Sequence, residues 1–210
     1  MTPHDKPSST KPPAASNLVA VAHQVTEAER ASRVGHAGAV VWLTGLPGSG
    51  KSTIAMALER KLFEQGWRAY TLDGDNVRRG VNADLGFSPD DRQENIRRIG
   101  EIAALFADAG TICITAFISP YRADRARARA AAGQRRFFEV HVNSGLATCE
   151  KRDPKGHYKK ARAGLLKDFT GVDAPYEMPT NPDTVIDTET QEIDGSVDQL
   201  LAFVVERCRV

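Results

Sequence analysis

The stretch GLPGSGKST, residues 45–53, constrains the fold of this chain more than any other feature. It follows the apolar run AVVWLT (39–44) and leads directly into a helix-like pattern. The pattern G-x-x-x-x-G-K-[S/T] between a strand and a helix is typical of a phosphate-binding loop. Its glycines let backbone N–H groups surround phosphate oxygens, and the following helix adds a favourable dipole. The sequence therefore predicts an α/β domain that binds ATP or GTP with magnesium.

The residues of this loop have separate expected roles. Lys51 is predicted to reach the β- and γ-phosphates as a catalytic residue, and Ser52 to offer its hydroxyl to Mg²⁺. The predicted ATP-binding set is Gly45, Leu46, Pro47, Gly48, Ser49, Gly50, Lys51, Ser52 and Thr53, with Arg152 further along the chain. A glycine-rich turn can also serve packing alone, but here both the spacing and the context favour nucleotide binding.

Strand-like and helix-like segments alternate through the rest of the chain. We expect strands over 39–44, 68–73, 111–117, 137–142 and 183–188, and helices over 52–66, 88–110 and 196–207. Ser88 should cap the second helix, with Pro89 at its first position and acids in its first turn. This alternation predicts right-handed βαβ units and a three-layer P-loop NTPase or kinase fold with a mostly parallel sheet.

Length and composition suggest one domain with a short extension ahead of it. A chain of 210 residues suits a single sizeable core. Residues 1–16 are rich in Pro, Ser and Thr, which predicts a disordered tail. Residues 17–36 form an N-terminal arm, either a helix packed on the domain or a partner-binding segment. Residues 37–210 are expected to form the domain itself.

Charge and cysteine content exclude several function classes. The net charge of +1 argues against a nucleic-acid binder, and no apolar run approaches the ~18 residues of a membrane span. The start lacks the apolar core of a signal peptide. Three cysteines show no metal-binding spacing, and Cys113 in a strand-like run is expected to be a buried thiol rather than a ligand. We therefore predict a cytoplasmic protein with neither nucleic-acid nor membrane partners.

Two acids lie at the end of the strand expected at 68–73. Asp73 ends that strand and Asp75 comes after one glycine. Ligands of open α/β sheets bind beyond the carboxyl ends of the strands, so both carboxylates should lie beside the glycine loop. We predict both as catalytic residues that accept the acceptor's proton and hold metal-bound water, with Asp75 and Ser52 as the metal-binding pair. A D-G-D-N turn with only a structural purpose is the alternative.

A small anionic alcohol is the expected acceptor. Arg78 follows the acidic turn directly, and Arg92 lies in the first turn of the helix at 88–110, where a cation opposes the helix dipole. The planar fork of arginine suits phosphate or sulfate. A GTPase switch is the main rival, but the chain has no N-K-x-D motif and its only D-x-x-G is DPKG at 153–156.

The segment 151–171, KRDPKGHYKKARAGLLKDFTG, is expected to form a lid. It combines basic residues with glycines, so it could close over the nucleotides, exclude water and add positive charge to the migrating phosphoryl group. A solvated surface helix is the alternative.

At the residue level the chain resembles adenylylsulfate kinases (APS kinases). The likeness rests on TLDGDNVRRGVNADLGFSPDDRQENIRRIGEIAALFADAG, CITAFISPYRADR, KGHYKKARAG and DFTG, and runs from about Val40 to Asp187. It implies that MgATP phosphorylates the 3′-hydroxyl of adenosine 5′-phosphosulfate (APS), giving 3′-phosphoadenosine 5′-phosphosulfate (PAPS) and ADP in sulfate assimilation. It also implies a homodimer and a functional link to an ATP sulfurylase.

The resemblance also implies an acceptor site. Asp75 would lie nearest the chemistry and Arg78 would hold the phosphosulfate, while Phe87 and Phe169 would clamp the adenine between them. The full set implied for APS is Asp75, Asn76, Val77, Arg78, Phe87, Arg92, Asn95, Ile118, Ser119, Lys155 and Phe169. Ser119 has been suggested in the family as a phosphorylated intermediate, but we favour a binding role because direct transfer needs no such step.

Two other functions stay open at this point. One is a P-loop kinase for another small alcohol, such as a sugar acid or shikimate, although the two phenylalanines favour a nucleotide acceptor. The other is a nucleotide-dependent regulator without turnover, against which Lys51, Ser52 and Asp75 argue. We expect neither the sulfurylase or GTPase domain of larger relatives nor the redox regulation of plant relatives, because the first cysteine of this sequence is Cys113.

Overall fold

A computed structural model describes residues 18–19 and 21–210, so the tail predicted over 1–16 lies outside the described residues. Its centre is a five-stranded, all-parallel sheet in the order β2-β3-β1-β4-β5. The strands are β1 (Ala39–Thr44), β2 (Ala69–Asp73), β3 (Ile112–Ala116), β4 (Arg136–Asn143) and β5 (Thr184–Asp187). Each lies within one or two residues of its predicted range. The parallel sheet and the fold class are confirmed.

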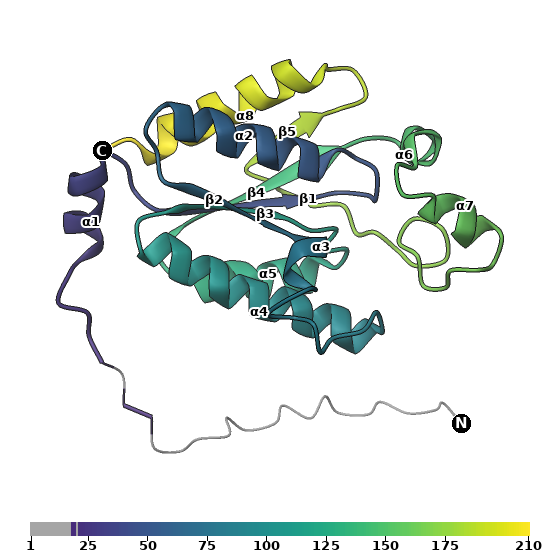
Figure 1. Cartoon of the computed structure of the whole chain (residues 1–210), viewed down its shortest axis with the longest axis horizontal. Helices are drawn as coiled ribbons and strands as arrows, with labels where there is room; N and C mark the ends of the chain where they lie inside the picture. Colours follow the sequence, from purple (N-terminus) through teal and green to yellow (C-terminus); the bar gives the residue numbers. More distant parts are fainter. Residues whose placement is uncertain (1–17, 20) are drawn as a thin grey trace.

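Helices cover both faces of this sheet (Figure 1). The helices of the described residues are α1 (Glu27–Val34), α2 (Lys51–Glu64), α3 (Gly74–Val77), α4 (Pro89–Asp108), α5 (Arg122–Ala132), α6 (Leu146–Arg152), α7 (His157–Arg162) and α8 (Ile193–Cys208). The helices α2 and α8 pack on one face, and α4 and α5 pack on the other. The result is the predicted three-layer sandwich. The helix α8 begins at Ile193, three residues before its predicted start, with Glu192 at the N-cap position.

The central strand β1 explains how the two layers are joined. All six of its residues are buried, as expected of a strand covered on both faces. Because side chains alternate along a strand, Val41 and Leu43 enter the core under α2 and α8, while Val40 and Trp42 enter the core under α4 and α5. A continuous apolar run was therefore the correct signal for a central parallel strand.

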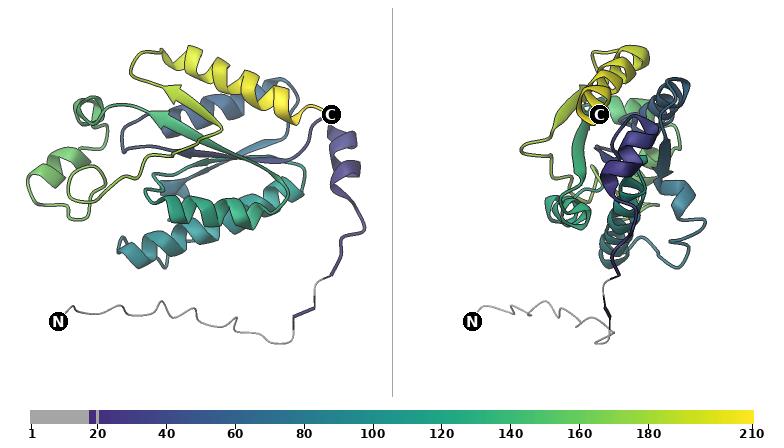
Figure 2. Two further views of the ribbon diagram at one scale, coloured as in Figure 1. Left: turned by 180° about the vertical axis from the view of Figure 1, so that it is seen from behind. Right: turned by 90° about the vertical axis from the view of Figure 1, so that its left-hand side faces the viewer.

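The described part of the N-terminal arm includes a helix packed on the domain. Thr26 and Glu29 form a capping box at the start of α1, and Ala31 is buried beneath it. Glu27 pairs with Arg136 at the start of β4, which ties this helix to the sheet. Figure 2 shows α1 at the end of the sheet that lies away from α6 and α7. Of the two alternatives for the arm, residues 27–34 follow the first.

Cys113, Cys149 and Cys208 are all unpaired and buried, so the prediction of a buried thiol at Cys113 is confirmed. Within residues 18–19 and 21–210, no helix has the length and apolar character needed to traverse a bilayer.

Candidate active site

The carboxyl ends of all five strands meet at one edge of the sheet, and a cavity of about 1230 Å³ opens there. Its walls come from the glycine loop, the start of α3, the β3–α5 loop, the segment 152–170 and the segment after β5. The predicted residues that line it are Pro47, Gly48, Gly50, Lys51, Ser52, Thr53, Asp73, Asp75, Arg78, Phe87, Arg92, Asn95, Ile118, Ser119, Arg152, Lys155 and Phe169. The fold thus brings most of the predicted site together.

The glycine loop has the geometry of an anion cradle. A Cβ atom at Gly45 would lie 2.4 Å from the carbonyl oxygen of Val142, so only glycine fits beside strand β4. Gly50 takes a left-handed conformation (φ 98°) and ends the loop at α2. No side chain caps that helix, so its first N–H groups remain available to a bound anion.

Lys51 is buried at the base of this loop. Its Nζ donates to the carbonyl oxygens of Gly45 (2.9 Å) and Leu46 (2.8 Å). Burial of the ammonium group lowers the pKa of Lys51 to about 8, although nearby Asp73 favours the charged form. A negative charge bound at the loop would therefore stabilise the protonated form of Lys51.

This pKa predicts a pH dependence of nucleotide binding. Phosphates raise the pKa of Lys51, so the affinity for ATP should be steady just below pH 8 and fall as the pH rises from about 8 toward 10.5. Binding in that window should take up close to one proton. Isothermal titration calorimetry at one alkaline pH, in two buffers with different ionisation enthalpies, measures the uptake. Equal heats in both buffers would show that Lys51 does not titrate on binding.

Asp73 organises the start of the acidic turn. Its Oδ2 accepts a hydrogen bond from the Ser52 hydroxyl at 2.6 Å, and its Oδ1 accepts from the backbone N–H of Asp75 at 3.0 Å. Asp73 is buried and acts as the N-cap of α3. The pair of Ser52 and Asp73 offers the hard oxygen atoms that Mg²⁺ prefers. Among the described residues no group of three or more His, Cys, Asp or Glu side chains forms a separate metal site.

Asp75 faces the segment predicted to be the lid. Its Oδ2 forms an ion pair with Nζ of Lys155, and both side chains are exposed. This pair joins α3 to the connection between α6 and α7, two parts of the chain that are far apart in sequence. Asp73, rather than Asp75, is the acid in contact with Ser52.

The acceptor side of the cavity is formed by the connection between α3 and α4. Arg78 donates to the carbonyl oxygens of Leu85 (3.2 Å) and Gly86 (2.7 Å), and its guanidinium carbon lies 4.5 Å from the centre of the Phe87 ring. Phe87 is 68% exposed, which is unusual for an aromatic side chain without a ligand. Arg78 therefore supports an aromatic surface at the cavity wall.

Arg92 links this wall to the lid segment. Its Nε donates to the carbonyl oxygen of Phe87 (2.9 Å) and its Nη2 donates to that of Asp168 (2.7 Å). Ser88 accepts from the backbone of Asp91 and caps α4 as predicted. Arg92, in the first turn of α4, therefore bridges two walls of the cavity, which offsets its unfavourable position in the helix dipole.

Ile118 and Ser119 follow β3 at the floor of the cavity. Ser119 is 2% exposed and holds a left-handed backbone conformation (φ 39°). Its Oγ accepts from Nε1 of Trp42 at 3.1 Å, and Thr44 donates to the carbonyl oxygen of Ile118 at 2.7 Å. The serine hydroxyl is therefore engaged with the core.

Phe169 reaches the cavity from the far end of the lid segment, but it is 8% exposed. Its ring packs edge-on against Tyr158, with the ring centres 4.9 Å apart. The Tyr158 hydroxyl donates to the carbonyl oxygen of Pro47 at 2.9 Å. The lid segment is thus anchored directly on the glycine loop.

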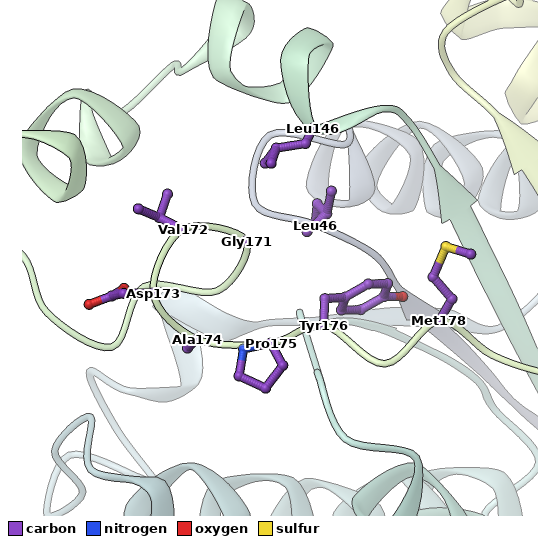
Figure 3. A pocket seen from close by; sticks show the side chains of 9 residues that line it. All are labelled: Leu46, Leu146, Gly171, Val172, Asp173, Ala174, Pro175, Tyr176 and Met178. Atoms are coloured by element: carbon purple, nitrogen blue, oxygen red, sulfur yellow. The ribbon is translucent and has the colours of Figure 1, made fainter.

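Five predicted residues are absent from the lining of the cavity: Gly45, Leu46, Ser49, Asn76 and Val77. Val77 is buried in the core under α4. The Leu46 side chain faces a second, apolar hollow beside Leu146 and the loop 171–178 (Figure 3). At Gly171 a Cβ atom would lie 3.1 Å from Leu46 and 3.2 Å from Leu146, so this glycine permits the backbone to pack closely on both leucines.

The segment after β5 supplies residues that sequence reasoning missed. Thr188 Oγ1 donates to the carbonyl oxygen of Ser49 at 2.9 Å, and Arg152 Nη1 donates to the same hydroxyl at 3.1 Å. The missed residues that line the cavity here are Thr188, Glu189, Thr190, Gln191, Glu192, Ile193 and Ser196. Their position at the carboxyl end of the last strand was the available signal.

Comparisons with known proteins agree on one family. The sequence model of the adenylylsulphate kinase family matches residues 37–187. An adenylyl-sulfate kinase of Enterobacter sp. (strain 638) is 58% identical over 185 residues, or 88% of this chain and 92% of that protein. One from Staphylococcus carnosus (strain TM300) is 53% identical over 184 residues, or 88% and 92%. The Mycobacterium tuberculosis APS kinase CysC, in complex with AMPPNP and APS, superposes with a TM-score of 0.77 at 50% identity, covering 81% of this chain and 98% of that one.

Proposed function

This chain belongs to the adenylylsulfate kinase family, and from that premise we propose how its cavity carries out the reaction. An adenylyl-sulfate kinase transfers the γ-phosphoryl group of ATP to the 3′-hydroxyl of APS. The observation that carries the proposal is that one cavity joins a glycine loop, an acidic turn and an exposed aromatic wall. Its lining is rich in Lys and Arg, which suits two polyanionic nucleotides.

We assign the glycine-loop end of the cavity to ATP. The free N–H groups at the start of α2 bind the β- and γ-phosphates, and Lys51 leaves the loop carbonyls to follow the migrating charge. Arg152, held against Thr188, borders this end. Ser52, with Asp73 behind it, would hold Mg²⁺, which would neutralise part of the phosphate charge.

We assign the opposite end to APS. Arg78 and Arg92 face this end, and the N–H groups that they do not donate to backbone carbonyl oxygens bind its phosphate and sulfate groups. Phe87 supplies an aromatic surface for the adenine, and Phe169 approaches the same cavity from the lid. Asp75 then lies nearest the acceptor hydroxyl and accepts its proton, while Lys155 moves from Asp75 to the substrate.

We propose that transfer is direct, with Ser119 as a binding residue. Its hydroxyl is buried against Trp42, which opposes a role as nucleophile. Closure of the segment 151–171 excludes water, so that ATP is not hydrolysed.

The stereochemical course at phosphorus tests this proposal. With ATP made chiral at the γ-phosphorus by sulfur and oxygen isotopes, a single in-line transfer to APS inverts the configuration. Transfer through a phosphorylated Ser119 involves two displacements and retains the configuration. Retention, together with loss of turnover in Ser119→Ala, would contradict direct transfer.

Asp73 gives a prediction about magnesium. In Asp73→Asn the amide nitrogen cannot accept from Ser52 or hold metal-bound water, so the Mg²⁺ concentration for half-maximal rate should rise about tenfold. Initial rates across a magnesium titration at fixed ATP measure this shift. Asp198→Asn, on the exposed surface of α8, is the matched control and should leave the titration curve in place. An unchanged curve for Asp73→Asn would remove Asp73 from the metal site.

We also propose a cytoplasmic homodimer that is functionally linked to an ATP sulfurylase supplying APS. The exposed apolar side chains of Leu18, Val19 and Val21, in the described part of the arm, support a contact with a second copy. Light scattering after size exclusion tests the dimer, and a monomer at micromolar concentration would contradict it. Arm side chains changed to serine should then weaken the dimer.

A further inference from the structure

Asn82 lies behind the acceptor side of the cavity, in the segment that joins α3 to α4. It is fully buried (0% exposed) in the turn between α3 and α4. Its backbone N–H donates to the carbonyl oxygen of Val77 (3.0 Å), and its carbonyl oxygen accepts from the backbone of Leu85 (3.1 Å). The turn therefore holds this side chain in a fixed place.

The side chain of Asn82 makes one hydrogen bond, and its partner is a cavity residue. Nδ2 of Asn82 donates to Oδ1 of Asn95 at 2.9 Å. Asn95 projects from α4, is 4% exposed, and lines the cavity. Because the oxygen of the Asn95 amide faces Asn82, its NH₂ group occupies the other side of the same plane. Asn95 thus offers a donor, not an acceptor, to the cavity.

The unpaired polar groups of Asn82 favour the same orientation of the two side-chain amides. Within the described part of the chain, Oδ1 of Asn82 is buried without a hydrogen-bond partner. Reversing both amides would put the Asn82 NH₂ group in that position, and both of its N–H donors would then be unpaired, in place of one donor and one acceptor. Buried unpaired N–H donors are rarer than buried unpaired carbonyl oxygens, which favours the orientation described.

We propose that Asn82 is a positioning residue that fixes the amide of Asn95 with its NH₂ group toward an acceptor atom of APS. The inference rests on the proposed assignment of this end of the cavity to APS. Asn82 itself does not touch the substrate. Its function is to prevent Asn95 from turning its carbonyl oxygen toward a nucleotide that is rich in acceptors and negative charge.

The isosteric variant Asn82→Asp tests this role. An aspartate accepts instead of donating, so Asn95 must turn its NH₂ group away from the cavity. The KM for APS should rise about tenfold, because a donor is replaced by an acceptor, while the affinity for ATP stays unchanged. In an Asn95→Ala background, Asn82→Asp should have no further effect on the KM for APS. Asn181→Asp, an exposed asparagine outside the cavity, is the matched control.

The outcomes separate the two proposals. An unchanged KM for APS in Asn82→Asp, or additive effects with Asn95→Ala, would overturn the positioning role while wild-type turnover with APS stands. Wild-type turnover without dependence on APS would overturn the proposed function itself. If Asn82→Asp fails to fold, NMR of the wild-type protein decides: the Asn95 side-chain NH₂ signal should shift on adding APS, and that of Asn82 should be protected from exchange. Protection of the Asn95 NH₂ group instead would contradict the orientation.

Discussion

Replacing Lys51 by alanine is expected to reduce kcat by about a thousandfold or more, because the lysine follows the charge of the migrating phosphoryl group. Its ammonium group is held by the carbonyl oxygens of Gly45 and Leu46, at the base of the loop where phosphates arrive. Single-turnover measurement of PAPS formation at saturating ATP and APS isolates the chemical step. The melting temperature should change little or rise, since the variant removes a buried charge.

Lys61→Ala is the matched control for this variant. Lys61 lies on the same helix, α2, but its Nζ pairs with Asp198 at the surface. A surface ion pair of this kind contributes little, so kcat should stay near that of the unaltered enzyme. If Lys51→Ala retained more than about a tenth of wild-type kcat, the lysine would be a structural element of the loop and not part of phosphoryl transfer.

Replacing Arg78 by alanine is expected to raise the KM for APS about a hundredfold while ATP binding survives. Arg78 supports Phe87 and donates to the carbonyl oxygens of Leu85 and Gly86, all on the acceptor side. Arg78→Lys should recover only part of the loss, because a lysine keeps the charge but not the planar fork. Steady-state kinetics with each substrate varied, together with equilibrium binding of an ATP analogue, separates the two affinities.

Arg79→Ala provides the control for charge. Arg79 is the next residue, exposed and outside the lining of the cavity. It should leave both KM values unchanged. Equal losses of APS and ATP affinity in Arg78→Ala would contradict the assignment of the two ends of the cavity.

The fold was predictable because its signals are local. The continuous apolar run at 39–44 became the buried central strand β1, and the cap and first-turn acids at Ser88 marked the start of α4. The glycine loop and Asp73 could also be placed, since both follow strands whose carboxyl ends share one edge of the sheet. Short-range patterns therefore located most of the cavity.

The remaining features depend on pairings between distant segments. Lys155 contacts Asp75, which is 80 residues away in sequence, and Thr188 contacts Ser49, which is 139 residues away. No local sequence pattern indicates either contact. Asp75 was predicted to pair with Ser52 at the metal, whereas Asp73 is the acid that contacts Ser52, because the chain turns into α3 directly after Asp73. The contact between Asn82 and Asn95 was hidden for a similar reason. Both residues occur in polar stretches that look solvent-exposed, yet both are buried.

The most direct test of the central claim is release of ADP by the purified protein with MgATP, in the presence and absence of APS. Shikimate and gluconate serve as alternative acceptors. ADP release that depends on APS, with an equal amount of PAPS and background rates for the other two alcohols, is the predicted result. ADP release at the same rate with and without APS would contradict the assignment of the acceptor site, and would leave only a nucleotide-binding glycine loop.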